Sequence, residues 1–289
     1  MEGIERIERV LVEALEAHRG TSCPPGLDAA VQHAVFPGGA RIRPQICLAV
    51  AEACGEDQPT VTDAAAASIE LLHCASLVHD DLPCFDDSPL RRGRASVHQA
   101  FGERLAVLAG DALIVLAFQV LARGARQAPD RLPALLGIVS RCCGMPNGIV
   151  AGQAWECEAD VALAVYQQSK TGSLFAAATM AGAASAGVDA EPWHLLGERI
   201  GNAYQVVDDI LDVAGDAEKL GKPLGQDEAQ QRPSYARQLG LEGARGHFDD
   251  LMAGIVEEIP PCPGRNRLKA RVVAEARRFL PSRLANDAA

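Results

Sequence analysis

Apolar residues recur at helical spacing along almost the whole chain, whereas the alternating runs of Val, Ile, Thr and aromatic residues that are typical of strands are scarce. Segments that contain Gly and Pro, such as residues 22–26, 55–59, 127–133 and 187–192, interrupt this pattern. The pattern predicts an all-α protein, a bundle of about ten to twelve helices with short connections. The sequence contains neither a long linker nor an internal repeat, so we expect a single helical domain over residues 1–289.

The composition of the 289 residues is that of a globular protein, with 48% hydrophobic and 22% charged residues. Only 4% are aromatic, so Ala, Leu, Val and Ile must build the core. The formal net charge of −11 argues against nucleic acid as a partner, because binding a phosphate backbone calls for a basic surface. Basic residues that cluster in so acidic a chain, such as those at 91–94, therefore stand out.

The spacing of the cysteines and the nature of the apolar segments indicate in which cellular compartment the protein resides. The nine cysteines show no paired CxxC spacing, which predicts neither a zinc site nor a disulfide framework. Residues 1–20 form an acidic amphipathic pattern, which predicts a first helix rather than a secretory signal. The most apolar stretch, residues 105–122, contains Asp111 and is interpreted as a buried helix, so no membrane span is expected. We expect a cytoplasmic protein with reduced thiols.

Two aspartate-rich segments carry the strongest chemical signal: residues 79–94 (HDDLPCFDDSPLRRGR), which follow an apolar helix, and residues 204–212 (YQVVDDILD), which lie within a second one. Closely spaced carboxylates repel one another when ionised, and a divalent cation removes this cost. Ligands that offer only oxygen suit Mg²⁺, with Mn²⁺ as an alternative ion. One such cluster alone is as well explained by a solvated helix end. Two of them, one followed by RRGR, favour a metal site for phosphate groups.

The spacing within these segments predicts how the carboxylates are arranged. Asp208 and Asp212 are four residues apart, which places both on one face of a helix, about 40° apart. Asp80 and Asp86 would fall about 120° apart on a regular helix. They can converge only where the helix is distorted, and Pro83 supplies a cause.

Several short motifs give the chain a family resemblance. From about residue 35 to about residue 240 it resembles the trans-isoprenyl diphosphate synthases, because GGARIRP, DDLPCFD with RRG, GDAL, GQ, KTG, YQVVDDILD and GKPLGQD occur in the order of that family. It is most similar to bacterial geranylgeranyl diphosphate synthases that feed carotenoid pathways. The resemblance implies the isoprenoid synthase fold around a central cavity, a homodimer, and the addition of isopentenyl diphosphate to an allylic diphosphate.

The resemblance also implies a role for individual residues. The implied metal ligands are Asp80, Asp86 and Asp208, with Asp81, Asp209 and Asp212 completing or orienting their surroundings. The implied contacts of the allylic diphosphate are Arg91, Lys170 and Lys222, with Thr171 and Gln205 at the reacting end. The implied contacts of isopentenyl diphosphate are Arg43, His73 and Arg92. The implied catalytic set is Asp80, Asp86, Arg91, Lys170, Thr171, Gln205 and Asp208. Taken alone, His73 is as well explained as a core histidine. The functional assignment of these residues rests on their occurring together in one chain.

The chain departs from the family pattern at a few positions. Ala40 stands where the family commonly has Lys, so one cation is missing at the isopentenyl site and weaker affinity for that substrate is expected. Arg232 replaces a common Lys, Glu156 replaces the usual Asp after GQ, and Ser88 with Pro89 replaces further acids of the first motif. None of these changes removes a residue implied in metal binding.

Helix residues that precede Asp80 can limit the length of the product, since each helical turn rises about 5.4 Å along a growing tail. Family members that stop at fifteen carbons often carry a bulky aromatic residue four or five positions before this aspartate, where the chain has Ser76 and Ala75. We therefore expect a twenty-carbon product, with Leu71 and Leu72 one turn deeper as candidate floor residues.

Three alternative functions stay open at this point. A farnesyl diphosphate synthase would perform the same chemistry with one condensation fewer. A class I terpene cyclase would ionise a similar substrate, but it would not need the second diphosphate site that Arg43 and RRG offer. A non-enzymatic helical scaffold with acidic, cation-binding loops would leave Lys170, Gln205 and Lys222 without a reason.

Overall fold

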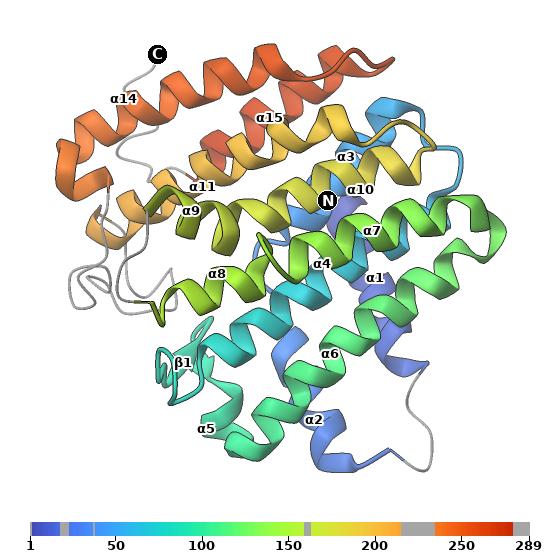
Figure 1. Ribbon diagram of the computed structural model, residues 1–289, viewed down its shortest axis with the longest axis vertical. Helices are drawn as coiled ribbons and strands as arrows, with labels where there is room; N and C mark the ends of the chain where they lie inside the picture. Colours follow the sequence, from blue (N-terminus) through green and yellow to red (C-terminus); the bar gives the residue numbers. More distant parts are fainter. Residues whose placement is uncertain (1, 18–22, 37, 159–162, 215–234, 280–289) are drawn as a thin grey trace.

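The computed structural model describes residues 2–17, 23–36, 38–158, 163–214 and 235–279 (Figure 1). Its elements in chain order are α1 (Glu2–Glu16), α2 (Pro25–Val35), α3 (Ile42–Cys54), α4 (Pro59–Asp80), β1 (Leu90–Arg91), β2 (Arg94–Ala95), α5 (Val97–Phe101), α6 (Glu103–Gly124), η1 (Ala125–Gln127), η2 (Pro129–Arg131), α7 (Leu132–Cys143), α8 (Ile149–Trp155), α9 (Leu163–Gln167), η3 (Gln168–Gly172), α10 (Ser173–Ser185), η4 (Glu191–Trp193), α11 (His194–Ala214), α14 (Tyr235–Glu258) and α15 (Arg265–Phe279). The two short strands pair as an antiparallel hairpin. The predicted all-α class is confirmed.

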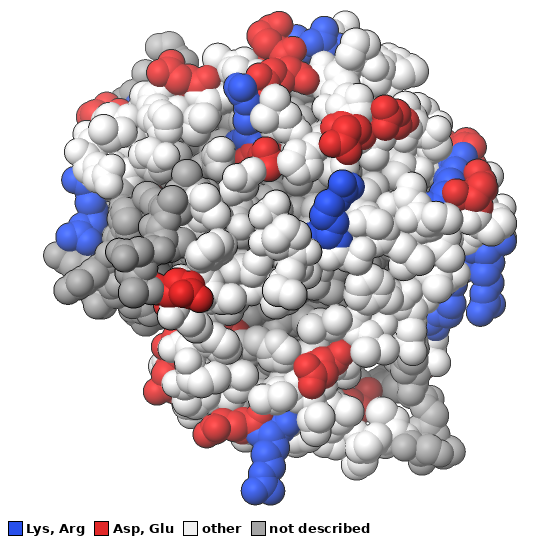
Figure 2. Space-filling model, in the orientation of Figure 1, with Lys and Arg blue, Asp and Glu red and all other residues white. Residues whose placement is uncertain are grey.

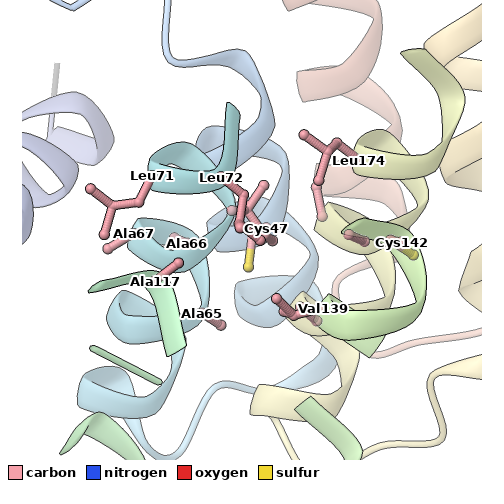
Figure 3. Packing of buried hydrophobic residues seen from close by; sticks show 14 of the residues in the cluster. Cys47, Ala65, Ala66, Ala67, Leu71, Leu72, Ala117, Val139, Cys142 and Leu174 are labelled. Atoms are coloured by element: carbon pink, nitrogen blue, oxygen red, sulfur yellow. The ribbon is translucent and has the colours of Figure 1, made fainter. Parts of the chain in front are cut away.

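Helices α4 and α10 form the centre of the fold. Every residue of α10 is buried, and α4 packs against α3, α6 and α10. Small residues allow these helices to approach closely, because a Cβ on Gly182 of α10 would lie only 2.5 Å from the carbonyl oxygen of Cys47 in α3. Figure 3 shows the core that α3, α4, α7 and α10 share, with Cys47, Leu72, Val139 and Leu174 among its side chains. This core holds the ends of α4 and α11 in fixed positions.

Helix α6 differs from the sequence-based expectation. Two helices are long and apolar enough to cross a membrane by length and composition alone, Pro59–Asp80 and Glu103–Gln127. The most apolar window of the first is 78% buried, whereas that of the second is only 44% buried. The prediction of a buried helix is therefore correct for only part of α6, because one of its faces exposes Val107, Leu108 and Val115. Figure 2 shows few charged side chains over the middle of this side of the molecule.

Candidate active site

A cavity of about 900 Å³ opens among α4, α6, α8 and α11. Its charged lining consists of Arg43, Asp80, Asp86, Asp87, Arg91, Lys170, Asp208 and Asp212. Its apolar lining includes Leu72, Ala75, Ile114, Cys143, Ile149 and Leu174. Along α4 the lining runs from Asp80 at the helix end to Leu72, about 12 Å deeper at the rise of an α-helix. The cavity therefore combines a mouth that suits a cation, or an anionic head that is bound through a cation, with a depth that suits a hydrocarbon tail.

The first aspartate motif forms the mouth of the cavity because α4 ends at Asp80. The chain then turns, and the N–H of Asp86 donates to the carbonyl oxygen of Asp80 at 3.0 Å. This turn contains Pro83, and it brings the two carboxylates together as the spacing argument requires. Ligand atoms of Asp80, Asp86 and Glu156 all lie within 4.8 Å of one another.

Lys170 reaches this carboxylate group from η3, a π-helical turn of the kind that is frequent at functional sites. Its Nζ donates to Asp80 Oδ1 at 3.0 Å and to Glu156 Oε1 at 2.6 Å. Gly152 of α8 makes this approach feasible, because a Cβ there would lie 2.4 Å from the backbone nitrogen of Lys170. In the sequence alone, Glu156 stands out only as a departure from the family pattern. The GQ motif at Gly152, one helical turn before it, was the available signal.

Arg91 and Asp81 form an ion pair at the mouth of the cavity. The Nε of Arg91 donates to both carboxylate oxygens of Asp81, at 3.0 Å and 3.2 Å. Burial raises the pKa of the Asp81 carboxyl, and the guanidinium of Arg91 acts in the opposite direction. Arg91 lines the cavity but Asp81 does not, so Asp81 lies where it orients Arg91 rather than where it faces a ligand.

The second motif divides between the cavity and the surrounding core. Asp208 and Asp212 both line the cavity, in agreement with their predicted common helix face. Asp209 is buried and does not line the cavity. It accepts hydrogen bonds from Gln205 Nε2 at 3.0 Å and from the backbone N–H of Tyr235 at 2.7 Å. These bonds leave the carbonyl oxygen of Gln205 to accept from Thr171 Oγ1 at 3.3 Å, and both of these residues line the cavity.

Two of the three residues assigned to isopentenyl diphosphate line the cavity. Arg43 stacks on the ring of Phe175 at 4.4 Å, and its Nη1 lies 3.3 Å from His73 Nε2. Burial, and next the charge of Arg43, hold the pKa of His73 well below its usual value of 6.5, so the ring is neutral and can accept this hydrogen bond. Arg92 does not line the cavity, and its Nη2 lies 4.0 Å from Glu70 Oε1.

Of the positions expected to set product length, some line the cavity and one does not. Leu72, Ala75 and Ser76 line the cavity, whereas Leu71 is fully buried in the core, because adjacent residues on a helix face different directions. The facing wall, formed by α6, α7 and α10, was not predicted, since nothing in the order of the sequence indicates which helices meet α4. Lys222 and Arg232 lie outside the described residues.

The donor set at the mouth of the cavity fits a divalent cation. The three carboxylates of the Asp80 group offer only oxygen ligands within 4.8 Å of one another, and Asp208 and Asp212 add two more carboxylates to the same cavity. Mg²⁺ prefers such ligands and typically links them to substrate phosphates. Fold and site together define an all-helical enzyme that handles a substrate with a phosphate head and an apolar body.

Comparison with known proteins gives the family. Residues 24–260 match the polyprenyl synthetase family. The chain is 52% identical over 276 residues to the geranylgeranyl diphosphate synthase of Rhodobacter capsulatus (96% of each chain) and 50% identical over 281 residues to that of Cereibacter sphaeroides (97% of this chain, 98% of the relative). A solved Helicobacter pylori geranyltransferase, complexed with magnesium and isoprenyl diphosphate, matches with a TM-score of 0.81 and 30% identity, covering 94% of this chain and 95% of that one.

The chain belongs to the polyprenyl synthetase family and is a prenyl-transferring enzyme. Enzymes of this family use isopentenyl diphosphate and allylic diphosphates as substrates. The class and the fold that the motifs predicted are thereby confirmed, and the assignment of individual residues follows below as a proposal.

Proposed function

We propose that this enzyme condenses isopentenyl diphosphate with allylic diphosphates and releases geranylgeranyl diphosphate. The observation that carries the proposal is one cavity with carboxylates and cations at the end of α4 and apolar side chains deeper along the same helix. The names of the relatives that are 50% and 52% identical over nearly the full chain support the same product.

The diphosphate of the allylic substrate is assigned to the mouth of the cavity. Mg²⁺ held by Asp80, Asp86 and Asp208 would neutralise the charge that develops on the leaving diphosphate, and Mn²⁺ is proposed as a substitute. Lys170 and Arg91 bind the oxygens of the same diphosphate, Lys170 through its compact ammonium charge and Arg91 through its planar guanidinium group. Lys170 must then exchange its hydrogen bond to Asp80 for one to phosphate. Lys222 is proposed as a further contact on the strength of the motif alone.

The reaction begins with cleavage of the allylic carbon–oxygen bond, which leaves diphosphate and an allylic cation. The double bond of isopentenyl diphosphate then forms the new carbon–carbon bond, and the departed diphosphate takes the proton that is lost. The chain contributes the carbonyl dipole of Gln205, fixed by Asp209 and Thr171, which can face positive charge without attacking it. Apolar side chains deeper in the cavity exclude water from the cation.

Product length follows from the small residues in the first turn before Asp80. Ala75 and Ser76 line the cavity and leave the path toward Leu72 open. Ile114 of α6 and Cys143 of α7 also line the cavity, so the floor is assigned to residues of more than one helix. This arrangement supports a twenty-carbon rather than a fifteen-carbon product.

The enzyme is further proposed to be a cytoplasmic homodimer. All nine cysteines are free, which suits a reducing compartment. The exposed apolar face of α6, with Leu108 and Val115 51% and 56% exposed, is a surface that a second copy would cover. Sedimentation of the wild type and of Val115→Lys tests this part, and a monomeric wild type would refute it.

Incubation of the purified enzyme with Mg²⁺, isopentenyl diphosphate and dimethylallyl, geranyl or farnesyl diphosphate in turn tests the function. Geranylgeranyl diphosphate as the final product, with activity abolished by chelation of the metal, is the expected result. Farnesyl diphosphate as the end product would establish the shorter alternative. Cyclic hydrocarbon without elongation would establish a cyclase, and inactivity with every pair would refute the catalytic assignment.

A further inference from the structure

Glu70 of α4 is a buried carboxylate to which the reaction described above gives no part. Its side chain is 2% exposed, and its Oε1 lies 2.6 Å from Arg41 Nη1 and 4.0 Å from Arg92 Nη2. Arg41 precedes α3, and Arg92 lies in the turn between β1 and β2. One carboxylate on α4 therefore forms ion pairs with two arginines from separate segments of the chain.

Both arginines occupy an unfavourable backbone conformation. Arg41 has φ = 50° and Arg92 has φ = 54°, and within the described ranges Asp87 is the one other non-glycine residue with positive φ. A side chain with a Cβ disfavours this left-handed region. The two-residue hairpin turn Arg92–Gly93 accounts for the positive φ of Arg92, whereas Arg41 is held in this region by the contacts of its guanidinium group. Glu70 is the contact that the two arginines have in common.

Arg41 is held from several sides. Besides Glu70, its guanidinium donates to Glu8 Oε1 of α1 at 2.7 Å and to the carbonyl oxygen of Val35 at 2.8 Å. Arg43 follows two residues later in the first turn of α3 and reaches the cavity. The direction in which Arg43 enters the cavity therefore depends on how firmly Arg41 anchors the start of α3.

The charges around His73 require a counter-charge. Arg41, Arg43 and Arg92 all act to lower the pKa of this buried ring, as does Arg91, so four cations lie near it. The charge of Glu70 favours the protonated form of Arg43, whose pKa burial lowers. The buried Nε of Arg43 has no hydrogen-bond partner in the described structure.

We propose that Glu70 is a positioning residue for the isopentenyl diphosphate subsite: through Arg41 it anchors the start of α3 so that Arg43 presents its guanidinium group in the cavity, and its charge holds the guanidinium of Arg92 behind that subsite. The inference rests on the function proposed above. It predicts a defect that is confined to one of the two substrates, because the groups assigned to the allylic diphosphate, Arg91 and Lys170, do not contact Glu70 in the described structure.

Steady-state kinetics with each substrate varied in turn tests the proposal in wild type and Glu70→Gln. The substitution keeps the shape of the side chain and removes its charge. The KM for isopentenyl diphosphate is expected to rise about tenfold, the effect of losing a hydrogen bond between charged groups. The KM for the allylic diphosphate is expected to stay within about twofold, a change too small to reflect a lost contact.

Asp63→Asn is the matched control. Asp63 also lies on α4 and forms a partly buried ion pair, with Arg6 of α1, but away from the cavity. It should lower thermal stability while leaving both KM values at the wild-type level. If Glu70→Gln does not fold, the double variant Arg41→Gln/Glu70→Gln removes both charges together and avoids a buried arginine that has lost its buried carboxylate partner. It is expected to show the same selective rise in KM.

Three outcomes separate the inference from the function on which it rests. Unchanged KM values in a folded Glu70→Gln, or in the double variant, would refute the positioning role while wild-type turnover upholds the function. An equal rise in both KM values would show a general structural effect and also refute it. Absence of turnover by the wild type would refute the proposed function itself.

Discussion

Gly152 gives the sharpest test of how the mouth of the cavity is built. Helix α8 lies so close to the π-helical turn η3 that a Cβ on Gly152 would stand 2.4 Å from the backbone nitrogen and 2.5 Å from the Cα of Lys170. Both of these are backbone atoms, which cannot swing aside as the tip of a side chain can. We expect Gly152→Ala to move the segment that carries Lys170 relative to α8.

The size of the effect follows from these distances. Ordinary contacts of a Cβ begin near 3.4 Å, so the two backbones must separate by about 1 Å. Lys170 Nζ lies 3.0 Å from Asp80 Oδ1, and a shift of about 1 Å breaks this hydrogen bond. Misplacement of a catalytic group by about 1 Å costs on the order of 100-fold in rate, or about 2.7 kcal/mol. Overpacking should also lower the free energy of unfolding by about 1–3 kcal/mol.

Elongation rates of wild type, Gly152→Ala, Lys170→Ala and the double variant, measured at 25 °C alongside urea unfolding, form the assay. Because Gly152→Ala acts through Lys170, it should cost about 100-fold in the wild type and little in the Lys170→Ala background. Gly137→Ala is the control. Gly137 lies exposed on α7 with space for a Cβ, so this change should leave the rate unaltered and stabilise the helix by about 1 kcal/mol.

Two results would refute this reasoning. A folded Gly152→Ala enzyme with nearly wild-type rates would show that α8 and η3 separate without moving Lys170 from its place. Equal losses in the wild-type and Lys170→Ala backgrounds would show that the substitution acts on some other part of the site.

Three further predictions concern single positions in the cavity or near it. Ala75→Tyr should shift the product from twenty to fifteen carbons, because an aromatic ring would block the path along α4, and an unchanged product distribution would contradict this. Ala40→Lys adds a cation at an exposed position next to Arg41 and should lower the KM for isopentenyl diphosphate by about threefold to fivefold. The pKa of His73 is depressed chiefly by burial, so the unfolded chain binds a proton that the folded chain excludes. Stability is therefore retained above pH 6.5 and falls below it by about 1.4 kcal/mol per pH unit, a decline that urea titrations of His73→Gln should lack.

The sequence by itself determined the fold class and the chemistry of the site. Hydrophobic periodicity is a local property, so it identified helices without knowledge of their partners. The four-residue spacing of Asp208 and Asp212 fixed their common face, because helix geometry alone decides it. Pro83 marked the point near which α4 ends and the first motif turns.

Only the tertiary structure decided which members of each motif face the cavity. Asp81 and Asp209 carry the same functional group as their neighbours, yet one pairs with Arg91 and the other orients Gln205. Their roles depend on which segments pack beside them, and such contacts between distant residues leave no trace in local spacing. For the same reason the approach of Glu156 to Lys170 and the partnership of Glu70 with Arg41 appear only when the helices are packed together.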